Sequence, residues 1–175
     1  MLFDLIASET SPLSLSEEDV AALAACERGT ILLDVAARAD ATLIALTGTN
    51  GWITLSLRAG RLDGEQVLGA VGRPEGPSGA GSAGGIQRRV FDAEDALGLD
   101  DGRPHTIAVT VNETGTHLYA DGYECFSTTL TAFLAQIGLT DVRIDPDGIA
   151  AVTRLAAWAE PLSDRAVMAQ SLAAT

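Results

Sequence analysis

Short runs of alternating apolar and polar residues, separated by tight-turn sequences, constrain the fold of this chain more than any other feature. In residues 105–111, Ile107, Val109 and Val111 alternate with Thr and Ala, which gives an extended strand one apolar side. Residues 112–115 then turn the chain, residues 116–120 return, and an Asp-Gly pair leads into residues 123–126. This segment predicts three antiparallel strands joined by hairpins.

The same strand pattern recurs along the rest of the chain. Further strands are expected at residues 2–7, 30–35, 41–47, 52–57, 66–71, 86–91, 141–145 and 149–159. No strand–helix–strand alternation accompanies them, so the chain is predicted to be all-β, a two-sheet antiparallel sandwich. A helix capped by Ser16 is expected at residues 17–28, with Gly29 just past its end, and a short one at residues 129–137. Ser163 caps a terminal helix or turn that extends to residue 169, so one or two short peripheral helices are expected in all.

Length and charge limit the class of protein. The 175 residues suit one domain, residues 1–175, with residues 73–85 as a long Gly-, Pro- and Ser-rich loop inside it. The net charge is −13, and all eleven basic residues are Arg. An anionic surface of this strength disfavours binding to nucleic acid and to anionic membranes.

The N-terminal residues and the apolar runs indicate where in the cell the chain is expected, and the two cysteines raise the question of a disulfide. The first residues lack the basic and long apolar regions of a signal peptide, and no apolar run approaches the roughly 20 residues of a membrane helix. A cytoplasmic location is expected for the chain as given, and an extracellular one if it belongs to a longer exported protein. Cys26 and Cys125 either pair or, as we favour, are two buried thiols.

Three segments carry a family resemblance. Residues 103–111 (RPHTIAVTV) and 115–122 (GTHLYADG) resemble the "W-H-x-V-x-V-x-V" strand and "G-x-x-L-Y-V-D-G" hairpin of concanavalin A-like and laminin-G-like domains, with Pro104 replacing the usual Trp. Residues 149–164 (IAAVTRLAAWAEPLSD) resemble the family's closing strand and "L-S-D" turn. The resemblance is nearest to the lectin-like domains that precede the catalytic propeller in bacterial sialidases.

This resemblance implies a jelly-roll sandwich of the concanavalin A-like lectin/glucanase class. It implies a non-catalytic carbohydrate-binding or accessory domain, with a glycan or small-molecule ligand and with an enzyme or a second copy of the chain as partner. It places Tyr119 on an inward face, with its hydroxyl hydrogen-bonded. No cofactor is expected except calcium, for which Asp145 and Asp147 (and the pair at residues 100–101) are candidates, although turn geometry explains these acids equally well.

Catalytic motifs are incomplete. Glucanases of this class use carboxylates in a Glu-x-Asp-x-x-Glu pattern, which the chain lacks, and there is no Gly-x-Ser-x-Gly elbow. The hairpin pattern is expected to bring His105 and His117 near each other, with Asp121 as the nearby acid. The alternative to a binding domain is therefore a stand-alone enzyme that uses the concave face of the jelly roll as a small-molecule site.

A sugar site on this fold would combine an aromatic platform with a few polar groups, and Arg would suit an acidic sugar because its planar fork matches a carboxylate. The candidate ligand-binding residues are Trp52, Arg58, Arg61, Arg88, Arg89 and Tyr123. The competing interpretation is that Trp52 and Trp158 are core residues and that the arginines only solubilise the surface.

Overall fold

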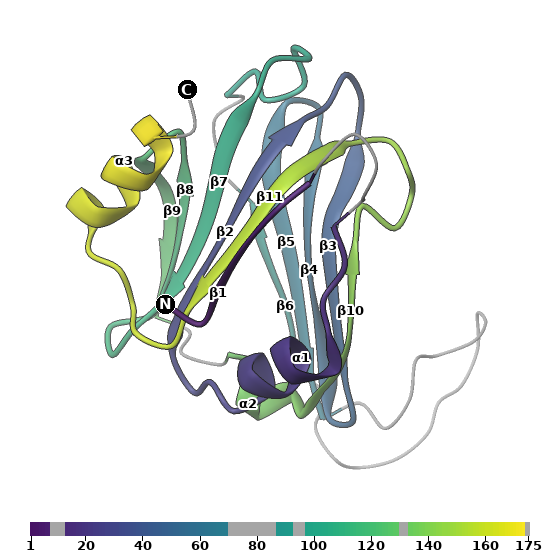
Figure 1. Cartoon of the computed structure of the whole chain (residues 1–175), viewed down its shortest axis with the longest axis vertical. Helices are drawn as coiled ribbons and strands as arrows, with labels where there is room; N and C mark the ends of the chain where they lie inside the picture. Colours follow the sequence, from purple (N-terminus) through teal and green to yellow (C-terminus); the bar gives the residue numbers. More distant parts are fainter. Residues whose placement is uncertain (8–12, 70–86, 93–96, 130–132, 174–175) are drawn as a thin grey trace.

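The computed structural model describes residues 1–7, 13–69, 87–92, 97–129 and 133–173, with residues 87–92 described by their backbone alone. Its strands form two antiparallel sheets that face each other (Figure 1). This confirms the all-β, two-sheet architecture that the alternating runs predict. None of the helices in these residues is long and apolar enough to span a membrane.

The six-stranded sheet contains strands from the N-terminal part, the middle and the C-terminal part of the chain. Its order is β1-β11-β2-β7-β8-β9, so the N-terminal strand is an edge and pairs with the last strand. The strands are β1 (Phe3–Ile6), β11 (Ala151–Trp158), β2 (Gly29–Ala36), β7 (His105–Val111), β8 (Thr116–Ala120) and β9 (Tyr123–Thr128).

The five-stranded sheet is mostly a run of consecutive hairpins. Its order is β10-β3-β4-β5-β6, and only the β10–β3 neighbours are distant in sequence. The strands are β10 (Leu139–Ile144), β3 (Ala41–Gly48), β4 (Gly51–Arg58), β5 (Arg61–Leu68) and β6 (Gln87–Asp92).

The main core lies between the two sheets because alternate side chains of each strand point inward. In β2 these are Ile31, Leu33 and Val35, and in β4 they include Leu55 and Leu57, all nearly inaccessible to water. Two helices, α1 (Glu17–Ala24) and α2 (Leu134–Ile137), close one end of the sandwich and add their apolar residues to the same core.

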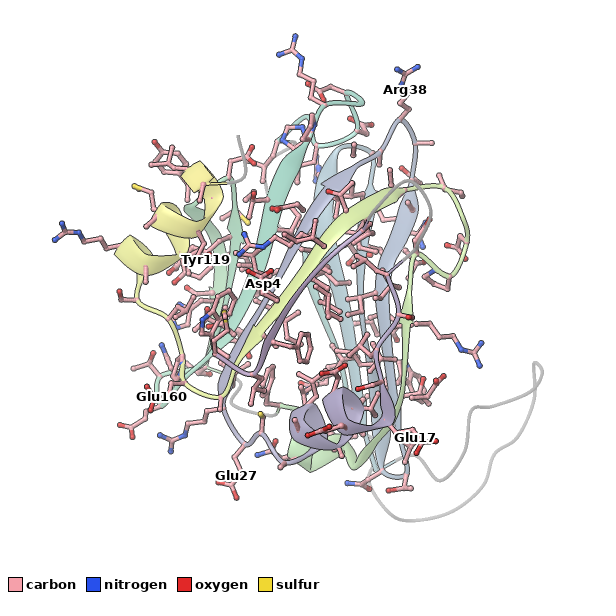
Figure 2. All side chains as sticks on the ribbon, in the orientation of Figure 1. Asp4, Glu17, Glu27, Arg38, Tyr119 and Glu160 are labelled. Carbon is pink, nitrogen blue, oxygen red and sulfur yellow. The ribbon has the colours of Figure 1, made fainter. Side chains whose placement is uncertain are left out.

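The third helix, α3 (Asp164–Ala173), lies on the outer face of the six-stranded sheet (Figure 1). Beneath it a second, small core contains Leu32, Ala108, Tyr119, Trp158 and Val167, among others. Tyr119 is therefore buried under a helix rather than between the sheets, as Figure 2 shows, so the expected inward face was wrong. Its hydroxyl is hydrogen-bonded, as expected.

Helix α1 ends four residues earlier than the sequence predicts. The Ser16 cap is confirmed, since the Asp19 N–H donates to Ser16 Oγ at 3.1 Å and the Ser16 N–H donates to Asp19 Oδ2 at 3.0 Å. Gly29 is not the helix terminator but the first residue of β2. A Cβ on Gly29 would come within 2.3 Å of the Trp158 carbonyl oxygen, so this glycine allows β2 and β11 to approach closely.

Strand β5 begins at Arg61, five residues before the predicted start. Asp63, Gly64 and Glu65 give little strand signal in the sequence, because these residue types are depleted in strands. Pairing with β4 on one side and β6 on the other overrides that local preference. The predicted loop at residues 73–85 lies outside the described residues.

The cysteines do not pair. Cys26 is buried near α1, where its thiol donates to the Ala22 carbonyl oxygen, and the Cys125 thiol donates to the Leu118 carbonyl oxygen. Burial raises the pKa of both thiols. The interpretation as two separate thiols is therefore the one that the structure supports.

The attachment of α3 can be tested at one hydrogen bond. The Tyr119 hydroxyl donates to Asp164 Oδ1 at 2.8 Å, at the first residue of the helix. Tyr119→Phe should lower the free energy of unfolding by about 1 kcal/mol, measured by urea denaturation followed by circular dichroism. Tyr123→Phe is the matched control, because Tyr123 is 69% exposed and should lose nothing. Equal stability of the two variants would contradict the prediction.

Candidate functional site

The hairpin between β4 and β5 carries two arginines that face each other. Arg58 ends β4, Arg61 begins β5, and their Cα atoms pair directly across a two-residue turn. Arg58 alternates with the core residues Leu55 and Leu57, so both arginines lie on the outer face of the five-stranded sheet. This hairpin lies at the end of the sandwich away from α1, beside the turn that carries Arg38 (Figure 2).

The tip of the hairpin is held from two sides. Ala59 and Gly60 have φ values of 49° and 72°, in the left-handed region, which costs a non-glycine residue about 1 kcal/mol. The Ala59 N–H donates to Asp40 Oδ1 at 2.7 Å. On the other side, the N–H groups of Leu97 and Leu99 donate to the Gly60 carbonyl oxygen at 3.0 and 3.3 Å.

Arg58 and Arg61 form no ion pair within the part of the chain that the structure describes. Four other arginines of that part do pair with acids, namely Arg28 with Glu113, Arg103 with Asp101, Arg143 with Asp141 and Arg154 with Asp4. Like charges directly opposite each other on neighbouring strands are destabilising. Two directly paired arginines with no ion-pair partner among the described residues are therefore a candidate anion-binding pair, in a protein of charge −13.

Trp52 lies on the same face of β4 but not beside the arginine pair. It is six residues from Arg58, which is about 20 Å along a strand. Its Cα pairs with Val67 on β5, and Val67 pairs with Arg88 on β6, so these residues form one row across the sheet. The side chains of Arg88 and Arg89 lie outside the described residues. The competing interpretation of Trp52 as a core residue fails, because Trp52 is half-buried on an outer face.

Tyr123 lies on a different sheet from Trp52, Arg58 and Arg61. It begins β9, the edge strand of the other sheet, and most of its side chain is exposed. The structure therefore does not bring Tyr123 together with Trp52, Arg58 or Arg61.

The two calcium candidates stabilise turns. Asp145 Oδ1 accepts the N–H groups of Ile149 and Ala150, each at 3.0 Å, and Asp147 Oδ2 accepts the Thr42 N–H at 3.3 Å. Calcium takes six to eight oxygen ligands. Among the described residues, no group of three or more His, Cys, Asp or Glu side chains is placed to hold a metal ion.

The two histidines are not neighbours, and the expectation that the hairpin joins them was wrong. His105 begins β7 and pairs with Val35, whereas His117 on β8 pairs with Thr110, five residues further along β7. That separation is about 17 Å along the strand. Because His105 and Thr110 are an odd number of positions apart on the strand, the two imidazoles also belong to opposite faces of the sheet.

His105 joins two acids from different parts of the chain. Its Nδ1 lies 2.9 Å from Asp121 Oδ2, and its Nε2 lies 3.2 Å from Asp101 Oδ1. The ring is only 13% exposed. Burial favours the neutral ring, but hydrogen bonds and attraction to the two carboxylates outweigh it and raise the pKa of His105 above its ordinary value.

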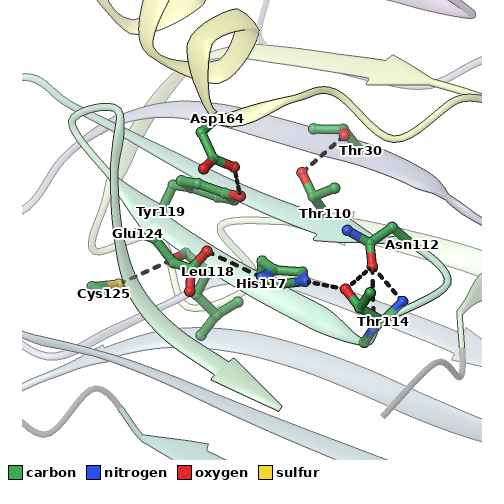
Figure 3. A network of polar contacts seen from close by, with 11 residues as sticks. Thr30, Thr110, Asn112, Thr114, His117, Leu118, Tyr119, Glu124, Cys125 and Asp164 are labelled. Atoms are coloured by element: carbon green, nitrogen blue, oxygen red, sulfur yellow. Dashed lines mark hydrogen bonds and ion pairs between the residues drawn. The ribbon is translucent and has the colours of Figure 1, made fainter. Parts of the chain in front are cut away.

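His117 lies within a chain of polar contacts (Figure 3). Its Nδ1 lies 3.1 Å from Glu124 Oε2 and its Nε2 lies 3.2 Å from Thr114 Oγ1, an order that resembles a hydroxyl–histidine–acid triad. The Thr114 hydroxyl, however, lies 2.6 Å from Asn112 Oδ1, which also accepts two backbone N–H groups. The hydroxyl proton is therefore directed to Asn112, and the chain of contacts stabilises the turn between β7 and β8.

A small cavity of about 30 Å³ lies between the sheets. Its walls are mostly apolar and include Ile31, Leu46, Val109 and Phe133. Pockets that bind small organic molecules measure about 300–1,000 Å³. This cavity is therefore far too small for a sugar ring.

The fold is shared with known sugar-binding proteins. A carbohydrate-binding domain (CBM40) of the Ruminococcus gnavus IT-sialidase, bound to α2,3-sialyllactose, matches with a TM-score of 0.68 and 17% identity, covering 97% of this chain and 98% of that one. A leech intramolecular trans-sialidase in complex with 2,7-anhydro-Neu5Ac matches with a TM-score of 0.66 and 15% identity, covering 99% of this chain and 28% of that one.

A third match is the binding domain of botulinum neurotoxin serotype D/C, with a TM-score of 0.56 and 10% identity, covering 91% of this chain and 39% of that one. No family model and no curated protein sequence matches the chain. At these identities the likeness establishes the fold, and it confirms the predicted jelly roll of the lectin-like class.

The residues that hold the hairpin tip were not predicted from the sequence. Asp40 and the segment at residues 97–99 gave no signal, because they approach Gly60 only through tertiary contacts. The pairing of Arg58 with Arg61 was not predicted either, because the strand after residues 52–57 was expected to begin only at residue 66.

The backbone strain at the tip gives a stability prediction. Ala59→Gly should raise the free energy of unfolding by up to about 1 kcal/mol, because glycine adopts the left-handed region without a Cβ clash. Gly60→Ala should lower it, since the new Cβ would lie 2.8 Å from Asp100 Oδ1 and the residue keeps φ at 72°. Urea denaturation of both variants checks this pair, and a change of the same sign in both would contradict it.

Proposed function

We propose that this chain is a non-catalytic carbohydrate-binding domain that takes the carboxylate of an acidic sugar at Arg58 and Arg61. The observation that carries the proposal is the arginine pair itself, two directly paired residues on one sheet face with no acid partner among the described residues. Repulsion between the two like charges raises the free energy of the unliganded protein, and a bound anion reduces that repulsion.

The chemistry of the pair suits a carboxylate. Each guanidinium is planar and can donate two parallel N–H···O hydrogen bonds, which a carboxylate accepts. The hairpin tip is held by Asp40 and by the backbone of residues 97–99, so the two arginines are partly preorganised. A neutral sugar would gain much less from two adjacent positive charges.

The fold neighbours support the choice of sugar. The Ruminococcus gnavus domain is bound to sialyllactose and the leech enzyme to a sialic acid derivative, and both sugars are acidic. Because fold alone does not imply function, the arginine pair is the main support for an acidic ligand, and these neighbours only indicate the first ligands to test.

The proposal includes a partner. The leech protein is more than three times as long as the part that this chain matches, so there the shared fold belongs to a larger enzyme. We therefore propose that this domain works beside an enzyme that acts on the same glycan, either in the same polypeptide or as a separate subunit.

Calorimetric titration with 3′-sialyllactose, and with lactose as the neutral probe, tests the function. Sialyllactose should release heat and lactose should not. Arg58→Ala and Arg61→Ala should each weaken the binding about 10- to 100-fold, since a hydrogen bond to a charged group contributes about 1.5–3 kcal/mol.

Arg165→Ala is the matched control for these two variants. Arg165 is an exposed arginine on α3, against the other sheet, and its removal changes the net charge equally. It should leave the affinity unchanged. Equal binding of lactose would contradict recognition of the acid group, and loss of binding only in Trp52→Ala would move the site to the row of Trp52 and Arg88.

A further inference from the structure

His105 connects the β8–β9 turn to the segment at residues 97–104. Asp121, which belongs to that turn, accepts the Thr106 N–H through Oδ1 at 2.9 Å and contacts the imidazole through Oδ2. Asp101, in the segment, contacts the other ring nitrogen. The imidazole is thus the side-chain link between β7 and this segment.

The same segment supports the arginine hairpin. Leu97 and Leu99 donate their N–H groups to the Gly60 carbonyl oxygen, and Leu99 is almost completely buried. Between these contacts and His105 lie only Asp100 and Asp101, and Asp100 Oδ1 lies where a Cβ on Gly60 would clash. Asp101 is therefore joined to the turn that carries Arg58 and Arg61 through Asp100 and Leu99.

The protonation state of His105 decides whether its ring can donate hydrogen bonds to both Asp121 and Asp101. An imidazolium donates from both ring nitrogens and can satisfy both carboxylates. A neutral ring donates from only one nitrogen, so a lone pair then faces the other carboxylate. The contact to Asp121 is the shorter by 0.3 Å, and Asp101 is independently held by the Arg103 N–H at 2.7 Å. The contact between His105 and Asp101 is thus the weaker one in the neutral state.

The charged groups nearest the ring are two carboxylates, and the Arg38 side chain packs against Gly102, next to one of them. Asp121 faces it from the β8–β9 turn, and Asp101 faces it from the 97–104 segment, with the Arg103 guanidinium 3.5 Å from Asp101. On the neighbouring strand β2, Asp34 accepts the Thr106 hydroxyl at 2.7 Å and lies near Arg154. Of these groups, His105 has the ordinary pKa nearest to neutral pH.

We infer that His105 is a positioning residue for the arginine pair, and that its protonated form fixes the hairpin in the conformation that binds the acidic sugar. The inference rests on the proposed function and adds a pH dependence to the same site. Since the pKa of His105 is raised in the folded protein, its contribution is complete below its unfolded value of about 6.5 and is lost as the pH rises through the folded value.

The test is the affinity for 3′-sialyllactose at about pH 5.5 and about pH 8.5, on either side of the range in which histidine titrates. The wild-type chain should bind about fivefold more weakly at the higher pH, at the lower end of the range for coupled sites. His105→Gln and Asp101→Asn should each remove this dependence, because neither keeps the imidazolium–carboxylate pair. Circular dichroism confirms that each variant is folded.

His117→Gln is the matched control. His117 lies on the opposite face of the sheet, far from the arginine hairpin, and its replacement should leave the pH profile as in the wild type. A wild-type profile in both His105→Gln and Asp101→Asn would overturn the inference, as would a pH-independent affinity in the wild type.

A ligand-free measurement separates this inference from the proposed function. Amide hydrogen exchange of Leu97 and Leu99, corrected for the intrinsic pH dependence, should show less protection above the pKa of His105 than below it, and no such change in His105→Gln. If sialyllactose fails to bind at any pH, the proposed function is wrong. Protection that does not follow the titration of His105 overturns the positioning role in either case.

Discussion

Burial of strand β2 on both of its faces is the constraint on which the rest of the structure depends. Ile31 and Leu33 face the core between the sheets, while Leu32 faces the second core beneath α3. A strand that is apolar on both sides needs cover on both sides. The five-stranded sheet covers one face of β2. Helix α3 covers the other, through Val167 and the hydrogen bond from the Tyr119 hydroxyl to Asp164.

This arrangement decides where a ligand site can lie. Helix α3 packs on the outer face of the six-stranded sheet, and the cavity found between the sheets among the described residues is small. The outer face of the five-stranded sheet is the large surface that α3 leaves uncovered, and it carries Trp52, Arg58 and Arg61. At one end of that face, a strained Ala59 and its hydrogen bond to Asp40 hold two like charges together.

The electrostatics of the molecule work at two ranges. At long range a net charge of −13 repels anions, so the chain is a poor general anion binder. At contact distance the local arrangement of charges dominates, because salt screens interactions beyond about 10 Å. The arginine pair is thus a local departure from the overall charge.

The sequence by itself determined the strands, because alternation with a period of two and tight-turn residues are local properties. It predicted the β7–β8–β9 hairpins, the sandwich and the Ser16 cap. Only the tertiary structure decided the start of β5, the outward burial of Tyr119 and the separation of His105 from His117. It alone joined Asp40 to Ala59, because packing arises between segments that are distant in sequence.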